Sequence, residues 1–181
     1  MSDYSNTSIP EDEAHVKNLK NKSFPNISLP NQEGNLLRLY RLDTFRMVLY
    51  FFPMTGRPDR SLPDNWNNIP GAKGCTIQTC LFRDNYDEII SLNAVAVGIS
   101  TQSVDDNKEM TTRLKVPYDV LSDEKLELRT ELKLPIFSIN KKIYLKRITI
   151  IIEKNIIKKV FYPIYSIDKH IEEVLKWLQE N

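Results

Sequence analysis

Three apolar runs, separated by segments of helical periodicity, constrain the fold of this chain more than any other feature. The runs are FRMVLYFFP at 45–53, NAVAVGIS at 93–100 and LKRITIIIE at 145–153. Continuous apolar segments of this length, rich in branched and aromatic residues, are typical of strands buried on both faces. A fourth segment at 155–164 follows the third after a short polar turn, and it predicts a strand paired with the third run.

Helical patterns lie between and after these runs. Apolar residues recur at helical spacing within 76–92, and Ser103 can cap a helix over 103–115. A third helix is expected after Ser166. Its apolar stripe consists of Ile167, Ile171, Val174, Leu175 and Leu178. Strands that alternate with helices predict an α/β fold, with helices on both faces of the sheet.

Length and charge limit the number of domains and the kind of partner. The 181 residues carry a formal net charge of +1, and 41% of them are hydrophobic. These values fit a single globular domain and give no indication of a nucleic-acid or membrane partner. The first residues are polar and lack periodicity. We therefore expect a loosely ordered N-terminal arm over 1–22 and a domain over 23–181.

A long segment, 54–74, joins the first apolar run to the helix expected at 76–92. It is rich in Pro, Asn and Gly. Loops of this length are uncommon within a compact domain and are usually functional or mobile. Arg60 and Trp66 within it either shape access to a site or belong to an exposed flap.

Both cysteines of the chain, Cys75 and Cys80, follow this loop directly. The N-terminus has no apolar signal core, so we expect a cytoplasmic protein, in which a cysteine pair is more often catalytic or metal-binding than a permanent disulfide. A zinc site is disfavoured because only His15 and His170 could complete the ligand set. Inert packing remains an alternative, above all for Cys80. Cys75 follows a glycine at the start of a helix, where free N–H groups stabilise a thiolate.

The spacing of the two cysteines restricts how they can react with each other. Five residues of helix rise about 7.5 Å. A disulfide tolerates a Cα separation of at most about 7 Å without backbone movement. A bond between Cys75 and Cys80 therefore requires the first turns of the helix to unwind, which favours a transient disulfide over a structural one.

The stretch PGAKGCTIQTCLFRDN at 70–85 resembles the active-site segment of the peroxiredoxins, specifically the Q-type or bacterioferritin-comigratory branch, with the pattern P-G-C-T-x-x-A-C-x-F-R-D. The resemblance continues in order over roughly 23–180, through ISLPNQEGNLLRL, VLYFFP, VGISTQSVDDNKEM, YDVLSDEKLELRTELKL and VLKWL. The matching residues of the motif are Gly74, Cys75, Thr76, Cys80, Phe82, Arg83 and Asp84.

This resemblance implies a thioredoxin-like fold around a central mixed β-sheet. It also implies reduction of hydrogen peroxide and organic hydroperoxides without metal, haem or flavin. By position Cys75 would be the peroxidatic cysteine and Cys80 the resolving cysteine, with thioredoxin or a similar dithiol as reductant. The arginine that the family places beside the thiolate matches Arg147, although KKIYLKR could instead be a solvated basic run. We expect a monomer or a weak dimer.

The sequence departs from the family at one position. The family pattern Pro-x-x-x-Thr-x-x-Cys has a threonine three residues before the cysteine, where this chain has Ala72. An insertion explains the difference, because Pro53 and Thr55 precede the long loop. Our hypothesis is that the loop bulges out and Thr55 still reaches Cys75. The alternatives are the hydroxyl of Thr76 or the backbone N–H groups of the helix start.

The predicted substrate-binding residues are accordingly Thr55, Gly74 and Thr76. Two other functions stay open, the first of them because Ala72 stands at the threonine position. One is a peroxide sensor with little turnover, and the other is a thiol–disulfide exchanger that acts on proteins.

Overall fold

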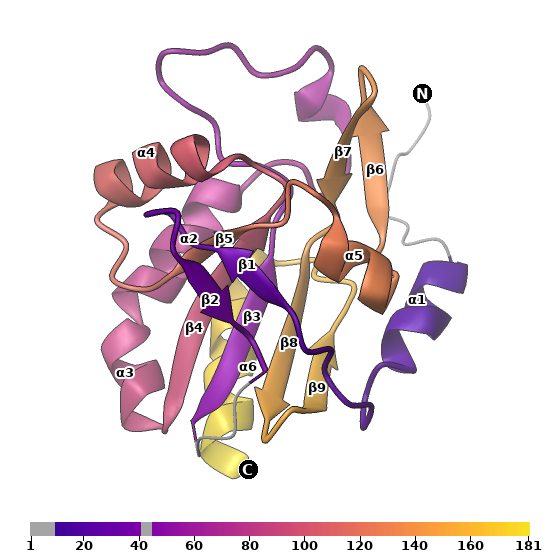
Figure 1. Ribbon diagram of the computed structural model, residues 1–181, viewed down its shortest axis with the longest axis vertical. Coiled ribbons are helices and arrows are strands. Elements are labelled where there is room, and N and C mark those ends of the chain that lie inside the picture. The colour runs from indigo at the N-terminus through magenta and orange to yellow at the C-terminus, as the bar shows by residue number, and fades with distance from the viewer. Residues whose placement is uncertain (1–9, 41–44) are drawn as a thin grey trace.

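A five-stranded mixed sheet forms the centre of the structure, a computed structural model that describes residues 10–40 and 45–181 (Figure 1). In chain order the helices and strands are α1 (Pro10–Lys17), β1 (Ser28–Pro30), β2 (Leu36–Arg38), β3 (Arg46–Phe51), the short 3₁₀ helix η1 (Trp66–Asn68), α2 (Cys75–Asp84), α3 (Tyr86–Ser91), β4 (Ala94–Ser100), α4 (Val104–Leu114), β5 (Val120–Ser122), α5 (Glu127–Leu132), β6 (Ile136–Ile139), β7 (Lys142–Leu145), β8 (Ile148–Glu153), β9 (Ile156–Phe161) and α6 (Ile167–Glu180).

The three apolar runs form the middle of this sheet. Its strand order is β5-β4-β3-β8-β9, in which β3, β4 and β5 are parallel to one another and β8 and β9 are antiparallel to their neighbours. The predicted strands are therefore confirmed as β3, β4 and β8. The fourth predicted strand is β9, and it follows a turn in which Lys154 and Asn155 both have positive φ. Two-stranded sheets, β1-β2 and β6-β7, lie outside the central one.

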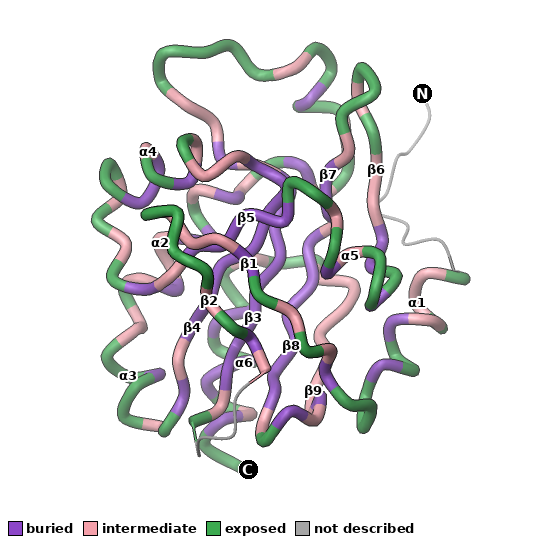
Figure 2. Tube along the Cα trace, in the orientation of Figure 1, coloured by how far each residue is buried: buried purple, intermediate pink, exposed green. Residues whose placement is uncertain are grey.

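The sheet is covered on both faces, as the α/β pattern predicts. Alternate residues of β3 point to opposite sides, so that Leu49 belongs to one buried cluster and Tyr50 to the other. The cluster around Tyr50 includes side chains of α2, α3, α4 and α6, whereas the cluster around Leu49 includes side chains of α1, β1 and α5. Figure 1 shows α6 behind the sheet and the β1-β2 pair in front of it, and in Figure 2 the central strands are almost continuously buried.

The N-terminal region differs from the loosely ordered arm expected over 1–22. Residues 10–17 form α1, and Val16 and Leu19 are buried in the core. His15 Nε2 lies 2.9 Å from the carbonyl oxygen of Leu132, and Lys146 pairs with Asp12 at 2.8 Å. The prediction is wrong for the described part of the arm, because Val16 and Leu19 are buried against the sheet. The largely polar composition of the segment gave no indication of this burial. The rest of the arm, residues 1–9, lies outside the described residues.

The helix expected over 76–92 is divided into α2 and α3 at Asn85. The side chain of Asn85 donates to the carbonyl oxygen of Leu81 at 2.8 Å, and its own backbone leaves the helical region. A side-chain amide that binds the backbone in this way competes with helix continuation. The helices after Ser103 and Ser166 begin as predicted, and each serine hydroxyl accepts from a backbone N–H of the first turn. Within the described residues no helix combines the length and apolarity needed to cross a membrane.

Candidate active site

Cys75 is the first residue of α2 and is buried, with 2% of its surface exposed. Gly74 precedes it with φ of +92°, a conformation that favours glycine. A side chain at Gly74 would also collide with α6, because its Cβ would lie 2.3 Å from Cδ1 of Ile167. Glycine at this position therefore lets the N-terminus of α2 pack closely against the start of α6 and places the thiol in the interior.

Arg147 brings a positive charge to the thiol. It precedes β8 and is buried, and its Nη2 donates to Cys75 Sγ at 3.4 Å. The same nitrogen donates to the carbonyl oxygens of Gly71, at 3.2 Å, and Lys73, at 2.8 Å. Among the described residues no carboxylate pairs with Arg147, although buried charges are ordinarily paired. The uncompensated guanidinium is therefore positioned to stabilise negative charge on Sγ, and a solvated basic run is not what the structure has here.

Gln78 belongs to the same site and was not among the predicted residues. It is almost completely buried, and its Oε1 accepts a hydrogen bond from Nη1 of Arg147. Its Nε2 has no hydrogen-bond partner among the described residues. The signal in the sequence is its spacing, because a residue three positions after Cys75 lies on the same face of a helix. Gln78 and the loop carbonyls together fix the plane of the guanidinium.

Cys80 lies one and a half turns further along α2 and is half-buried. Both cysteines are free thiols in this structure. The helix is continuous from Cys75 to Asp84, so the separation argued from the spacing applies and the two sulfurs cannot bond in this conformation.

The structure does not bring Thr55 into hydrogen-bond contact with Cys75. The hydroxyl and the backbone N–H of Thr55 both donate to Oε1 of Gln102, at 3.1 and 2.9 Å. The thiol of Cys75 instead donates to the carbonyl oxygen of Ala72 at 3.5 Å. Thr76 is half-buried, and among the described residues its hydroxyl makes no hydrogen bond. Of the predicted residues, Gly74, Cys75 and Thr76 follow one another at the start of α2. Arg147 contacts Cys75, and Thr55 is hydrogen-bonded to Gln102 instead.

Comparison with known proteins identifies the family. The model of the AhpC/TSA family matches residues 67–160, which include the cysteines and Arg147. The chain belongs to the AhpC/TSA family.

Relatives place the chain in one branch of the peroxiredoxins. It is 31% identical to the chloroplastic peroxiredoxin Q of Sedum lineare over 91% of this chain and 80% of the relative, and 29% identical to that of Arabidopsis thaliana over 88% and 67%. Peroxidoxin BcpB from Mycobacterium tuberculosis has the same fold, with a TM-score of 0.74 and 26% identity over 89% of this chain and 96% of that one. The fold of peroxiredoxin Q from Xylella fastidiosa is similar too, with a TM-score of 0.72 at 19% identity over 89% and 95%. The chain is thus a peroxiredoxin of the Q or bacterioferritin-comigratory branch, with a thioredoxin-like fold and thiol-dependent peroxidase activity.

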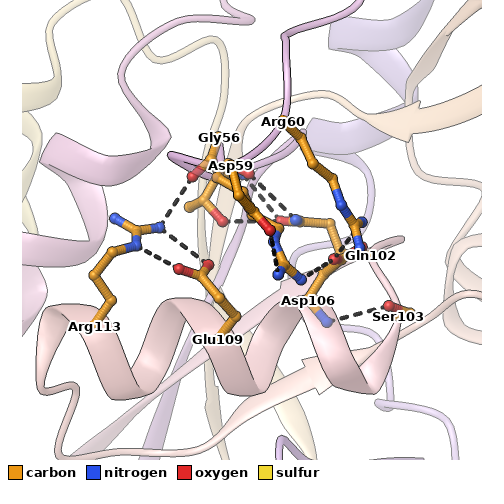
Figure 3. Close-up of polar contacts among 10 residues, drawn as sticks. Gly56, Asp59, Arg60, Gln102, Ser103, Asp106, Glu109 and Arg113 are labelled. Atoms are coloured by element: carbon orange, nitrogen blue, oxygen red, sulfur yellow. Dashed lines mark hydrogen bonds and ion pairs between the residues drawn. The ribbon is translucent and has the colours of Figure 1, made fainter.

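The long loop of this peroxiredoxin is fastened at several points. Arg57 and Arg60 both donate to Oδ1 of Asp106 at 3.1 Å, and Arg113 donates to the carbonyl oxygen of Gly56 at 3.0 Å. Figure 3 shows how these groups join the loop to α4, which carries Asp106 and Arg113. The loop thus has a defined position against the helix.

Trp66, which lies further along the loop, is not part of an exposed flap. It is buried in a small cluster with Ala72 and Tyr144, and its ring centroid lies 5.0 Å from that of Tyr144. The exposed-flap alternative is therefore wrong at this residue, and the cluster supports the backbone just before Cys75.

A buried histidine contributes to the electrostatics around Arg147. His170, on α6, lies 2.8 Å from the hydroxyl of Thr149 through Nε2. Burial, together with the smaller effect of the charge of Arg147, lowers the pKa of His170 to about 4. His170 is therefore neutral at physiological pH. Within the described residues no group of three His, Cys, Asp or Glu side chains is placed to hold a metal ion.

Proposed function

We propose that this peroxiredoxin uses a two-cysteine cycle. The thiolate of Cys75 attacks the terminal oxygen of a hydroperoxide ROOH, so that an S–O bond forms as the O–O bond breaks. The hydroperoxide proton leaves with the departing oxygen as ROH, and the sulfenate takes a proton from solvent to become a sulfenic acid. The thiol of Cys80 then attacks that sulfur, so that an S–S bond forms and water leaves. Thioredoxin or a similar dithiol restores both thiols by exchange through a mixed disulfide.

The observation that carries this proposal is the contact between Arg147 Nη2 and Cys75 Sγ at the N-terminus of α2. In the attack, negative charge moves from the sulfur to the departing oxygen. A fixed guanidinium in a buried site stabilises such charge more than water does, since it needs no reorganisation. Arg147 can serve this role because the hydrogen bonds of Nη1 to Gln78 and of Nη2 to the loop carbonyls hold the guanidinium beside Cys75.

The peroxide needs hydrogen-bond donors, and the helix start offers them. The first intrahelical hydrogen bond of α2 runs from Gln78 N to the carbonyl oxygen of Gly74 at 2.8 Å. The backbone N–H groups of Cys75, Thr76 and Ile77 precede it and are available to a ligand. We propose that these groups hold the peroxide, together with the Thr76 hydroxyl. A direct contribution from Thr55 would require its hydroxyl to leave Gln102.

The test is peroxide consumption by the purified protein with thioredoxin, thioredoxin reductase and NADPH. Cys75→Ser should abolish turnover, because no other thiol has the arginine contact. Cys80→Ser should consume one equivalent of peroxide and then stop, because the sulfenic acid cannot be resolved within the chain. Peptide mapping under non-reducing conditions should show the Cys75–Cys80 disulfide in the oxidised wild type. Full steady-state turnover by Cys75→Ser would overturn the assignment.

Two alternative functions have distinct signatures in the same assay. A peroxide sensor would oxidise slowly at Cys75 and keep its disulfide in the presence of the reductant. A thiol–disulfide exchanger would react with a model disulfide as fast as with peroxide. The displaced Thr55 hydroxyl is the observation behind the first alternative. The cytoplasmic location, the monomeric or weakly dimeric state and the identity of the dithiol stay predictions.

A further inference from the structure

Two buried tyrosines hold the middle of α2 against the sheet. The hydroxyl of Tyr118 donates to the carbonyl oxygen of Thr79 at 2.9 Å, and it lies 3.0 Å from the hydroxyl of Tyr50. Because the one proton of Tyr118 goes to Thr79, Tyr50 donates to Tyr118. The Tyr50 hydroxyl also lies 3.4 Å from Oγ1 of Thr79. Thr79 directly precedes Cys80, so the contact falls within the segment that joins the two cysteines.

A glycine on the neighbouring strand leaves room for the Tyr50 hydroxyl. Tyr50 lies on β3 opposite Gly98 of β4, and a Cβ at Gly98 would lie 2.8 Å from the Tyr50 hydroxyl. Glycine there leaves the space in which the hydroxyl meets Tyr118. The ring of Tyr50 stacks on Phe82 of α2 with centroids 4.4 Å apart and planes 6° apart. The tyrosine pair therefore depends on Gly98 and, through the ring of Tyr50, also contacts the helix.

Both tyrosines stay protonated donors. Burial raises the pKa of Tyr118 well above its ordinary value, and burial also raises the pKa of Tyr50. Neither hydroxyl ionises at the pH values at which a peroxidase works, so the hydrogen bond to Thr79 is present throughout.

The hydrogen bond opposes the conformational change that the second cysteine requires. Cys80 can reach Cys75 only if the first turns of α2 unwind. Unwinding moves the Thr79 carbonyl away from Tyr118 and leaves buried hydroxyl groups to find new partners, which costs free energy. We infer that Tyr118, supported by Tyr50, is a positioning residue that keeps α2 wound around Cys75 and sets the rate at which Cys80 resolves the sulfenic acid. This inference rests on the two-cysteine cycle proposed above.

The rate of unwinding decides between two fates of the sulfenic acid. In one, Cys80 attacks and water leaves. In the other, a second ROOH reacts with the sulfenic acid, which gains an oxygen to become a sulfinic acid while ROH leaves. A tightly held α2 favours the second fate at high peroxide concentration, and a loosely held α2 favours the first.

The experiment compares Tyr118→Phe with Tyr86→Phe as the matched control. The ring of Tyr86 lies 5.2 Å from that of Tyr118, but among the described residues its hydroxyl makes no hydrogen bond. Tyr50→Phe is a second variant that removes the other hydroxyl. Each reduced protein is mixed with peroxide, quenched with acid and an alkylating reagent at set times, and analysed by intact mass for sulfenic acid, disulfide and sulfinic acid.

In Tyr118→Phe, the first oxidation of Cys75 should proceed at the wild-type rate, and disulfide formation should be about five-fold faster, the factor expected from loss of one hydrogen bond. The sulfinic fraction in excess peroxide should fall by a similar factor. Hydrogen exchange of the α2 amides should accelerate, while that of the β8 amides stays unchanged. Tyr50→Phe should change the same quantities in the same direction, and Tyr86→Phe should match the wild type.

The outcomes separate this inference from the function on which it rests. If the disulfide forms at the same rate in Tyr118→Phe as in the wild type, the role of the tyrosine is overturned and the two-cysteine cycle stays intact. Equal acceleration in Tyr86→Phe, or equal loss of protection in β8, would mean a general loss of stability and would also overturn it. A wild type that oxidises at Cys75 and never forms the disulfide overturns the cycle and the inference with it.

Discussion

Gly74→Ala should test how the start of α2 is positioned, because the structure separates two costs at this residue. An L-residue held at φ of +92° costs about 1–2 kcal/mol relative to glycine. The new Cβ would also lie 2.3 Å from Cδ1 of Ile167, and displacing that side chain from its rotamer costs about 0.5–1.5 kcal/mol. The sum predicts a loss of about 1.5–3.5 kcal/mol in the free energy of unfolding.

Three further variants separate these costs. Ile167→Val removes Cδ1, and the nearest remaining atom, Cγ1, is 3.8 Å from the Cβ position. In the double variant only the backbone cost should remain, so the two substitutions should couple favourably by about 0.5–1.5 kcal/mol. Gly34→Ala is the matched control, because Gly34 has φ of +81° and nothing within 4 Å of its Cβ position. The free energy of unfolding of Gly34→Ala should fall by the backbone cost alone.

The assay is urea unfolding of the four variants and the wild type, combined with the second-order rate of Cys75 oxidation by peroxide. Gly74→Ala should slow that oxidation, because the shifted helix start moves Cys75 relative to Arg147, and Ile167→Val should restore part of the rate. Additivity of Gly74→Ala and Ile167→Val within about 0.5 kcal/mol would refute the contact between α2 and α6. Equal losses in Gly74→Ala and Gly34→Ala would refute it as well.

Two more predictions concern the charges of the site. Arg147→Lys keeps the charge but loses the planar guanidinium that binds Gln78, the loop carbonyls and Cys75 together. Oxidation of Cys75, measured by stopped flow, should therefore slow about 10- to 100-fold, and a wild-type rate would contradict this. The pKa of His170 is lowered from 6.5 to about 4 in the folded state, so the unfolded chain binds the proton first and stability is lost as pH falls from about 6.5 to about 4. His170→Gln should remove up to about 1.4 kcal/mol per pH unit from the slope of unfolding free energy against pH over that range, measured in urea, and equal slopes would contradict it.

Local patterns predict the framework of this peroxiredoxin well. The apolar runs give β3, β4 and β8, and Ser103 and Ser166 mark the starts of α4 and α6. Each of these signals acts between residues close in sequence, through alternation along a strand or a hydroxyl that caps the next turn. The division between α2 and α3 is local too, but the side-chain bond of Asn85 to Leu81 competes with an apolar pattern that continues past it.

The candidate site was predicted in part. Cys75 and Gly74 follow from the helix start, and the family resemblance supplies Arg147. Gln78 was missed because a buried glutamine has no distinctive pattern, and its role depends on a guanidinium 69 residues away in the sequence. The hypothesis that Thr55 reaches Cys75 stays a prediction, and in this structure both donors of Thr55 bind Gln102, from beyond the end of β4.

The sequence by itself determined the α/β architecture, the caps of two helices and the position of Cys75 at a helix N-terminus, because these depend on the periodicity and chemistry of neighbouring residues. Only the tertiary structure decided that α1 packs on the core, that Arg147 has no carboxylate partner among the described residues, and that Tyr118 reaches the carbonyl of Thr79. The last of these requires Tyr50 and Gly98 to be opposite each other in the sheet. Strand register and burial of this kind depend on packing between segments that are distant in sequence, so they cannot be predicted from local patterns.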